Sequence, residues 1–262
     1  MEKSTAIGIV LGLIAVFVGM VLKGASLTAL NNPAAFLIII VGTIACIFNA
    51  FPLNDVKKFP TLIKMLFRQP PQFPKDELLK LFVELSQTAR REGILALENR
   101  VTEIPDPFLR NGLSMVIDGL DPDFVGDVLD AEVHGMEERH RTGALIFSQA
   151  GSYAPTLGVL GAVVGLIAAL GNLNDIDKLG HSIAAAFIAT MLGIFTGYVL
   201  WHPFANKLKM MSKIEVENKK MMIEGILSLQ AGDSPTAIEA KLMVFIPQGQ
   251  RALLKPSEER NG

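Results

Sequence analysis

The chain has 262 residues, of which 50% are hydrophobic and 19% are charged. Its formal net charge of -2 argues against a nucleic-acid-binding protein, which needs a dense basic face. The single cysteine, Cys46, excludes a disulfide framework and a cysteine-rich zinc site. The mean hydropathy of +0.39 averages four strongly apolar stretches and a charged middle, a pattern that indicates a membrane protein.

Two apolar stretches near the start predict a membrane hairpin over residues 1–51. They read AIGIVLGLIAVFVGMVL and AAFLIIIVGTIACIFNAF, close to the roughly 20 residues that cross a bilayer as a helix. Pro33 suits the first position of the second helix, and Pro52 ends that helix. A signal peptide fits less well, because the apolar core is long and another span follows closely.

Residues 52–147 form an insert with the composition of a soluble domain. Apolar residues recur at helical spacing over residues 76–98, where Asp76 is placed to cap, and again from Phe108. Residues 124–141 predict a helix that continues into the next span. No segment alternates like a strand, so we expect a compact, all-helical cytoplasmic domain.

A second hairpin is predicted over residues 148–203, and its two stretches read YAPTLGVLGAVVGLIAALG and SIAAAFIATMLGIFTGYVLW. Small residues repeat at i+4 in both, a spacing that lets helix backbones approach closely in lipid. These residues are Gly161, Gly165 and Ala169 in the first stretch and Ala185, Ala189, Gly193 and Gly197 in the second. Ordinary membrane packing and a specialised pore-lining face explain this pattern about equally well. Pro155 lies within the first helix and Pro203 follows the second, and each removes a backbone hydrogen bond.

The second hairpin also lacks charge. No Asp, Glu, Lys or Arg occurs between Ala144 and Asn174, or between Ser182 and Asn206. Ion pumps and proton relays keep ionisable side chains inside the membrane. If this chain handles ions, we therefore expect another chain to supply the titrating group.

Lysine and arginine follow the second and fourth spans, whereas the two short loops hold only Lys23 and Lys178. By the positive-inside rule the insert, the tail and both termini are cytoplasmic. The tail, residues 204–262, is predicted to continue as an amphipathic helix to about Gln230, followed by a short helix over residues 235–244. The residues from Leu254 onward are expected to be disordered.

No sequence feature indicates an enzyme or a cofactor. There is no Walker loop, and no GxGxxG follows a strand, so no nucleotide site is predicted. A nearby group of His134, Glu137, Glu138 and His140 could hold a metal, but a solvated helix face is the better explanation. We therefore predict no metal site.

The most prominent group of charged residues lies in ARREGILALE, residues 89–98. If this segment is one helix, Arg91 and Glu98 share a face, and Arg90 lies about a quarter-turn away. Such a group is most often a solvated surface. It would also serve as an electrostatic docking surface that sets the register of a partner protein.

RREGILALE, DPFLRNGLSMVIDG, YAPTLGVLGAVVGLIAALG and WHPF, with four spans split by an insert, closely resemble the MotA/PomA family of flagellar motor stator subunits. The similarity covers essentially the whole chain. It implies a pentameric ring around a dimer of a MotB-type partner, which has one span with a membrane aspartate and a peptidoglycan-binding domain. It also implies that Pro155 and Pro203 couple protonation of the partner to the insert, and that Arg90 and Glu98 press on the rotor protein FliG.

The resemblance also bears on which ion passes. Sodium-type members of the family carry threonines where this sequence has Ala162 and Ala189, and Thr190 alone remains. Sodium must be held by several oxygens, so one hydroxyl per chain favours a proton. The alternative is that these alanines are only packing residues.

Two other interpretations stay open. One is an ExbB/TolQ-type energiser, which also surrounds a carboxylate-bearing partner but has three spans and begins outside. The other is a secondary transporter, for which broken helices, repeats or ionisable groups in the membrane would be expected.

Overall fold

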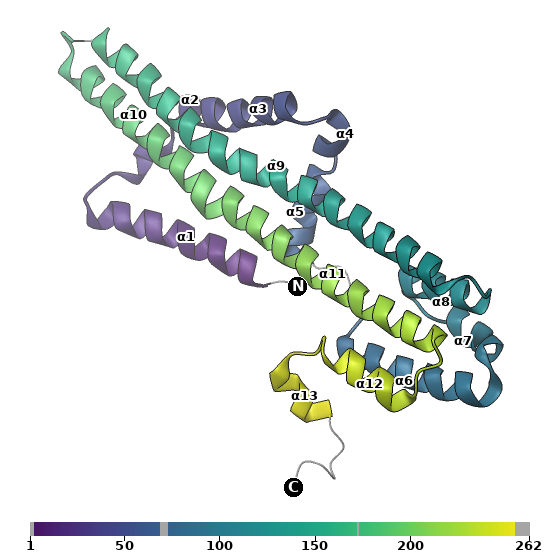
Figure 1. Ribbon diagram of the computed structural model, residues 1–262. Helices are drawn as coiled ribbons and strands as arrows, with labels where there is room; N and C mark the ends of the chain where they lie inside the picture. The colour runs from purple at the N-terminus through teal and green to yellow at the C-terminus, as the bar shows by residue number, and fades with distance from the viewer. Residues whose placement is uncertain (1–2, 69–72, 172, 255–262) are drawn as a thin grey trace. The chain divides into compact units, whose positions relative to one another are not determined.

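The computed structural model describes residues 3–68, 73–171 and 173–254, and the regular structure in these ranges is entirely helical (Figure 1). The chain divides into two compact units. We call residues 1–70 with 139–210 the membrane unit, and residues 71–138 with 211–262 the insert unit.

The membrane unit holds α1 (Lys3–Leu22), η1 (Leu27–Leu30), α2 (Pro33–Phe36), η2 (Leu37–Val41), α3 (Gly42–Ala50), α4 (Leu53–Val56), α5 (Phe59–Phe67), α10 (Ile176–Phe195) and η4 (Thr196–Trp201). The insert unit holds α6 (Lys75–Glu92), η3 (Ile94–Leu97), α7 (Glu98–Thr102), α8 (Pro107–Ile117), α12 (Pro235–Met243) and α13 (Gln248–Leu254). Two long helices, α9 (Pro122–Leu170) and α11 (His202–Gln230), contribute residues to both units.

Four helical segments are long and apolar enough to cross a membrane, as predicted. They lie in Lys3–Leu22, Leu27–Ala50, Pro122–Leu170 and Ile176–Gln230. The second begins as expected, with Pro33 in the first turn of α2 and the Asn32 side chain accepting from the N–H of Ala35 at 3.1 Å. Sequence reasoning missed its interruption by η2, a five-residue π-helix.

Aromatic side chains form the core of the membrane unit at one end of the spans. Phe59 of α5 stacks on Phe147 of α9, with ring centroids 4.9 Å apart. Trp201 and Phe204 complete the cluster, at 6.2 and 6.3 Å from Phe147. Such pairs stabilise by about 0.5–1.5 kcal/mol each beyond the area they bury. The cluster therefore fastens α5 to α9 and to the η4–α11 junction.

The insert unit is built on one apolar core that α6, α8, α12 and parts of α9 and α11 share. Phe82 of α6 is fully buried and lies against Gly225 of α11, where a Cβ would come within 2.4 Å of the ring. A half-buried ion pair joins Lys219 to Asp106 at 3.0 Å, and the Lys219 ammonium also lies 4.5 Å from the centre of the Phe108 ring. The predicted all-helical insert is therefore confirmed for the described residues.

Two local predictions for the insert are wrong. The helix expected over residues 76–98 ends at Glu92, because Gly93 adopts φ +88° and ψ 161° and breaks it. Asp76 does not cap, since the helix starts one residue earlier, at Lys75, and the capping position is Pro74. Asp76 lies in the first turn instead, where a carboxylate still suits the helix dipole.

The tail follows the predicted pattern. The amphipathic helix α11 ends at Gln230, and Gly232 takes φ +73° in the turn that follows. Ser234 caps α12 by accepting from the N–H of Ala237 at 3.1 Å. The disorder expected from Leu254 onward falls almost wholly on residues outside the described ranges.

Candidate functional site

The apolar parts of α9 and α10 lie side by side within the membrane unit, and their closest approach is at two glycines (Figure 1). A Cβ added at Gly193 would lie 2.7 Å from the carbonyl oxygen of Ala154 and 2.8 Å from the Cα of Gly158. A Cβ at Gly158 would lie 2.9 Å from the carbonyl oxygen of Ala189. No side chain fits at either position, so the two backbones are in direct contact.

This close contact continues towards the C-terminal end of α9. At one end, a Cβ at Gly165 would meet the Cβ of Ala186 at 3.1 Å. Nearer the centre, a Cβ at Gly161 would meet the Cβ of Ala189 at 3.1 Å. Much of the i+4 pattern of small residues is therefore used to pack α9 on α10 of the same chain.

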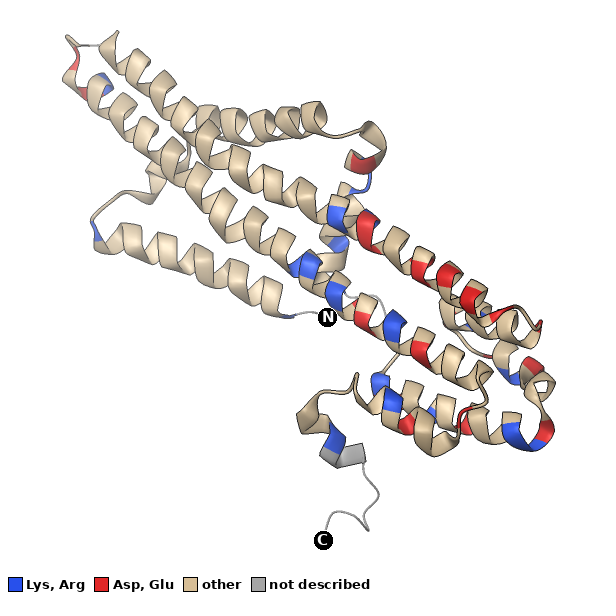
Figure 2. Cartoon of the chain, viewed as in Figure 1, with Lys and Arg blue, Asp and Glu red and all other residues tan. Residues whose placement is uncertain are grey.

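The paired stretches carry no charge, and Figure 2 shows them without blue or red along their length. The charged residues nearest to the α10 stretch in sequence are those of the connecting loop. There Asp175 caps α10 and pairs with Lys178 at 3.1 Å. Hydrogen bonds from the backbone N–H and the ammonium of Lys178 hold the pKa of the Asp175 carboxyl below its usual value. This charge belongs to the loop and not to an ion path through the span.

Pro155 faces the π-helix η4. A Cβ at Gly197 would lie 2.7 Å from Cγ of Pro155 and 2.8 Å from the carbonyl oxygen of Gly151. Pro155 has no N–H to offer that carbonyl, so the regular hydrogen bonding of α9 is interrupted there. The backbone hydrogen bonding of the opposing helix is also irregular, because the π-helix η4 runs over Thr196–Trp201. It ends two residues before Pro203. Where the two helices touch, α9 thus lacks one backbone hydrogen bond and the opposing helix is π-helical.

Sequence reasoning found both prolines but missed η4. Pro203 indicates an irregular helix, because a proline removes one backbone donor. It does not specify a π-helix of six residues. The wider turn of η4 brings Gly197 against the ring of Pro155. A π-turn inside a helix often marks a functional site.

The threonine hydroxyls in this region donate to their own helices. Thr190 donates to the carbonyl of Ala186 at 3.3 Å, and Thr196 donates to the carbonyl of Leu192 at 2.9 Å. Ala189 is buried, 2% exposed, against Gly158 and Gly161, and Ala162 is half-buried. The structure therefore puts Ala189 in the contact between the two helices, and Thr190 follows it in α10.

Arg90 and Glu98 are both exposed but belong to different helices. Arg90 lies in the last turn of α6, and Glu98 begins α7. The break at Gly93 corrects the expectation that Arg91 and Glu98 share the face of one continuous helix. None of these three charged residues forms an ion pair within the described ranges.

The segment between the two charges is anchored by Leu97 and by the partly buried Ile94. Leu97 of η3 is fully buried in the core of the insert unit, whereas Leu95 is 69% exposed. Arg100 pairs with Glu84 at 3.6 Å across the same turn. The described residues include no group of three or more His, Cys, Asp or Glu side chains that could hold a metal.

The chain is similar to proteins of flagellar motility along its whole length. Profiles of the MotA/TolQ/ExbB proton channel family and of the motility protein A N-terminal region match residues 100–221 and 6–93. Motility protein A of Bacillus subtilis (strain 168) is 55% identical over 263 residues, covering 100% of this chain and 97% of that protein.

Solved structures give the same result. The structure of the flagellar MotAB stator complex from Bacillus subtilis contains a chain that matches with a TM-score of 0.92 at 55% identity, covering 97% of this chain and 100% of that one. A chain in the structure of C. jejuni MotAB matches with a TM-score of 0.89 at 31% identity, covering 95% and 97%.

Proposed function

Since this chain belongs to the MotA/TolQ/ExbB proton channel family and matches motility protein A from end to end, we infer that it is a stator subunit of the bacterial flagellar motor. The match includes the first hairpin, within residues 6–93, which distinguishes a four-span stator subunit from a three-span ExbB/TolQ energiser. The chain is a membrane protein of a channel family rather than an enzyme.

The observation that carries the mechanism is the absence of Asp, Glu, Lys and Arg from the paired stretches of α9 and α10. A proton path needs a group that titrates inside the membrane. We propose that a MotB-type partner supplies it, as one membrane aspartate on a single span, and that a peptidoglycan-binding domain anchors this partner. The related structures are of MotAB complexes, which supports the pairing.

We propose that Pro155 and Pro203 transmit the protonation of that aspartate to the insert. Pro155 contacts the π-helix η4 at Gly197, and η4 leads directly to Pro203. Both helices lack regular hydrogen bonds there, so this level is where the helix pair bends most readily. Ala162, Ala189 and Thr190 are proposed to line or flank the ion path.

We extend the proposal to the rest of the assembly, and membership of the family supports it. Five copies form a ring around a dimer of the partner, the insert and both termini are cytoplasmic, and Arg90 and Glu98 act on the rotor protein FliG. The proposed domains are a membrane hairpin at residues 1–51, a cytoplasmic domain at 52–147, a channel-lining hairpin at 148–203 and a cytoplasmic tail at 204–262.

Reconstitution into vesicles tests the central proposal. With an imposed proton gradient, the chain alone is expected to give no proton flux, because the paired stretches of α9 and α10 hold no Asp, Glu, Lys or Arg. Adding the MotB-type partner should give flux, and changing the partner's membrane aspartate to asparagine should abolish it. Sizeable flux through the chain alone would contradict the proposal.

A further inference from the structure

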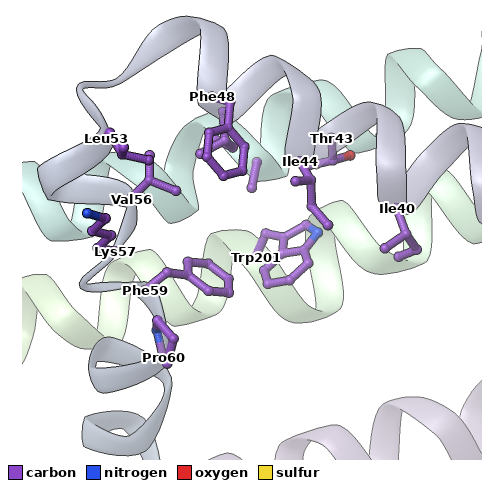
Figure 3. A pocket seen from close by; sticks show the side chains of 12 residues that line it. Ile40, Thr43, Ile44, Phe48, Leu53, Val56, Lys57, Phe59, Pro60 and Trp201 are labelled. Carbon is purple, nitrogen blue, oxygen red and sulfur yellow. The ribbon is translucent and has the colours of Figure 1, made fainter.

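A pocket of about 510 Å³ opens in the wall of the membrane unit, beside the second span (Figure 3). Helices α3, α4 and α5 frame it, and Ala150 of α9 and Trp201 of η4 form its floor. This volume lies within the roughly 300–1,000 Å³ of sites that bind small molecules. Apart from Thr43, Lys57 and the indole N–H of Trp201, the lining is aliphatic or aromatic.

The pocket extends along the span for about the depth of one membrane leaflet. Figure 3 shows Ile40 and Lys57 at its opposite ends, with Ile44 and Phe48 between them. At 1.5 Å per residue, the ten steps from Ile40 to Ala50 rise about 15 Å. The hydrocarbon core of a bilayer is roughly 30 Å thick, so one leaflet is about half of that.

A positive charge marks one end of the pocket only. Lys57 is exposed and has no ion pair in the part of the chain that the structure describes. The adjacent Lys58, in contrast, pairs with Asp55 at 2.8 Å. Lys57 directly follows α4, just past the end of the second span, where the ammonium is at the height of lipid headgroups.

We propose that this pocket binds one acyl chain of an anionic phospholipid, whose phosphate lies at Lys57. The apolar wall matches a hydrocarbon chain, the length matches a leaflet, and the free ammonium complements a negative headgroup. The proposal requires only that the chain spans a membrane. Its failure would therefore leave the stator function untouched.

The chain offers its own reporter, because Trp201 is its single tryptophan and lies in the pocket. The full chain is reconstituted in vesicles that hold a fixed fraction of phospholipid brominated on the acyl chains, since bromine quenches indole fluorescence on close approach. The brominated lipid is phosphatidylglycerol in one series and phosphatidylcholine in the other. One lysine near the surface should favour the anionic lipid by about fivefold, so phosphatidylglycerol should quench more strongly.

Matched variants separate binding in the pocket from general contact with lipid. Lys57→Gln should remove the preference for phosphatidylglycerol, whereas Lys64→Gln, at an exposed position of α5 outside the pocket, should retain it. Ile44→Phe adds volume to the pocket wall and should weaken quenching by both lipids. Ile14→Phe is the control, because Ile14 on α1 is similarly exposed, at 50% against 49% for Ile44.

Either of two results would overturn the proposal. Equal quenching by the two lipids, unchanged by Lys57→Gln, would mean that Trp201 meets only bulk boundary lipid. Absence of quenching, unchanged by Ile44→Phe, would mean that a second copy of the chain covers the pocket.

Discussion

At the scale of single residues, the exposed charges at residues 90–98 contrast with the paired charges elsewhere in the insert unit. Lys219 and Asp106, and Lys241 with Glu224 and Asp233, are joined by ion pairs within the fold. Arg90 and Glu98 are exposed and form none among the described residues. This difference separates charges that stabilise the insert from charges that are available to a partner.

Reversing both exposed charges, Arg90→Glu with Glu98→Lys, is expected to stop motility while the protein stays in the membrane and binds its partner. An exposed substitution of this kind usually changes stability by no more than about 0.5 kcal/mol. Swimming assays and membrane immunoblots check this, with the exposed Glu103→Lys as a control that should swim normally. Disappearance of the double variant from the membrane would show that the charges are structural. Rescue by opposite changes in FliG would support direct docking.

Asp233→Asn is expected to lower the thermal stability of the protein at neutral pH. The hydrogen bond from Lys241 holds the pKa of the Asp233 carboxyl below its usual value, and the same bond raises the pKa of Lys241. A carboxyl with a lowered pKa stabilises the fold above its unfolded-state pKa and loses that contribution as the pH falls through the folded-state pKa. The lysine contribution is present below the unfolded-state pKa of Lys241 and is lost as the pH rises through its raised folded-state value.

Thermal unfolding of the detergent-solubilised variant, followed by circular dichroism, tests this pH dependence. The difference from the parent should be present at pH 7 and should shrink at acid pH, below the usual pKa of an aspartate. Asp127→Asn, at an exposed position of α9, should leave the melting temperature unchanged. An equal loss for Asp233→Asn at all pH values would exclude the ion pair as the cause.

At the scale of elements, the sequence predicts what depends on long patterns and misses what depends on local geometry. The four spans follow from composition. The end of α11 follows from Gly232, and the start of α12 follows from Pro235. The break at Gly93 was missed because the apolar spacing continues across it, with Leu97 still buried. The π-helices η2 and η4 were missed because no residue type specifies an extra residue in a turn.

The contact between α9 and α10 was partly predictable. The i+4 small residues identified a surface of close approach but did not distinguish packing within the chain from a pore lining. The structure shows that much of the pattern, including Ala189, Gly193 and Gly197, packs against α9. This sequence indicates a partner only through the absence of a carboxylate from the paired stretches of α9 and α10.

Gly193→Ala is expected to destabilise the membrane unit and to lower the amount of protein in the membrane. The added methyl group would meet the backbone of α9 at 2.7–2.8 Å, and overpacking of this kind costs about 1–3 kcal/mol. Gly19→Ala in α1 is the control, because no atom lies within 4 Å of its added Cβ. Alanine there should be neutral or stabilising, since glycine inside a helix is unfavourable by about 0.5–1 kcal/mol. Equal thermal stability of the two purified variants would contradict the backbone contact.

At the scale of the whole molecule, we expect the chain to work only together with a partner protein. The paired stretches of α9 and α10 hold no Asp, Glu, Lys or Arg, and the insert presents unpaired charges. In the membrane unit, Pro155 meets the π-helix η4. Family membership and the four spans follow from the sequence alone. We propose that Ala162, Ala189 and Thr190 favour a proton, although the identity of the ion depends on the completed complex.

Cells that rely on this stator are expected to swim at a speed that is independent of external sodium and falls when a protonophore is added. The single hydroxyl of Thr190 donates to its own helix at 3.3 Å, so it offers little towards the oxygen shell that sodium needs. Swimming speed is measured across sodium concentrations at fixed external pH. A speed that tracks sodium and survives the protonophore would reverse the assignment of the ion.

The π-helix η4 lets the helix that runs from α10 into α11 hold one extra residue without turning the faces that follow it. An α-helix turns by about 100° per residue, and a π-turn holds one residue more than an α-turn. Deleting one residue within 196–201 would therefore let an unbroken α-helix form, and the side chains after the deletion would keep their present direction relative to α10. The same deletion in a regular α-helical stretch of α10 would instead rotate every later side chain by about 100° relative to the residues before it. For this subunit, the widened turn thus absorbs a residue whose removal elsewhere in the helix would change all the downstream faces.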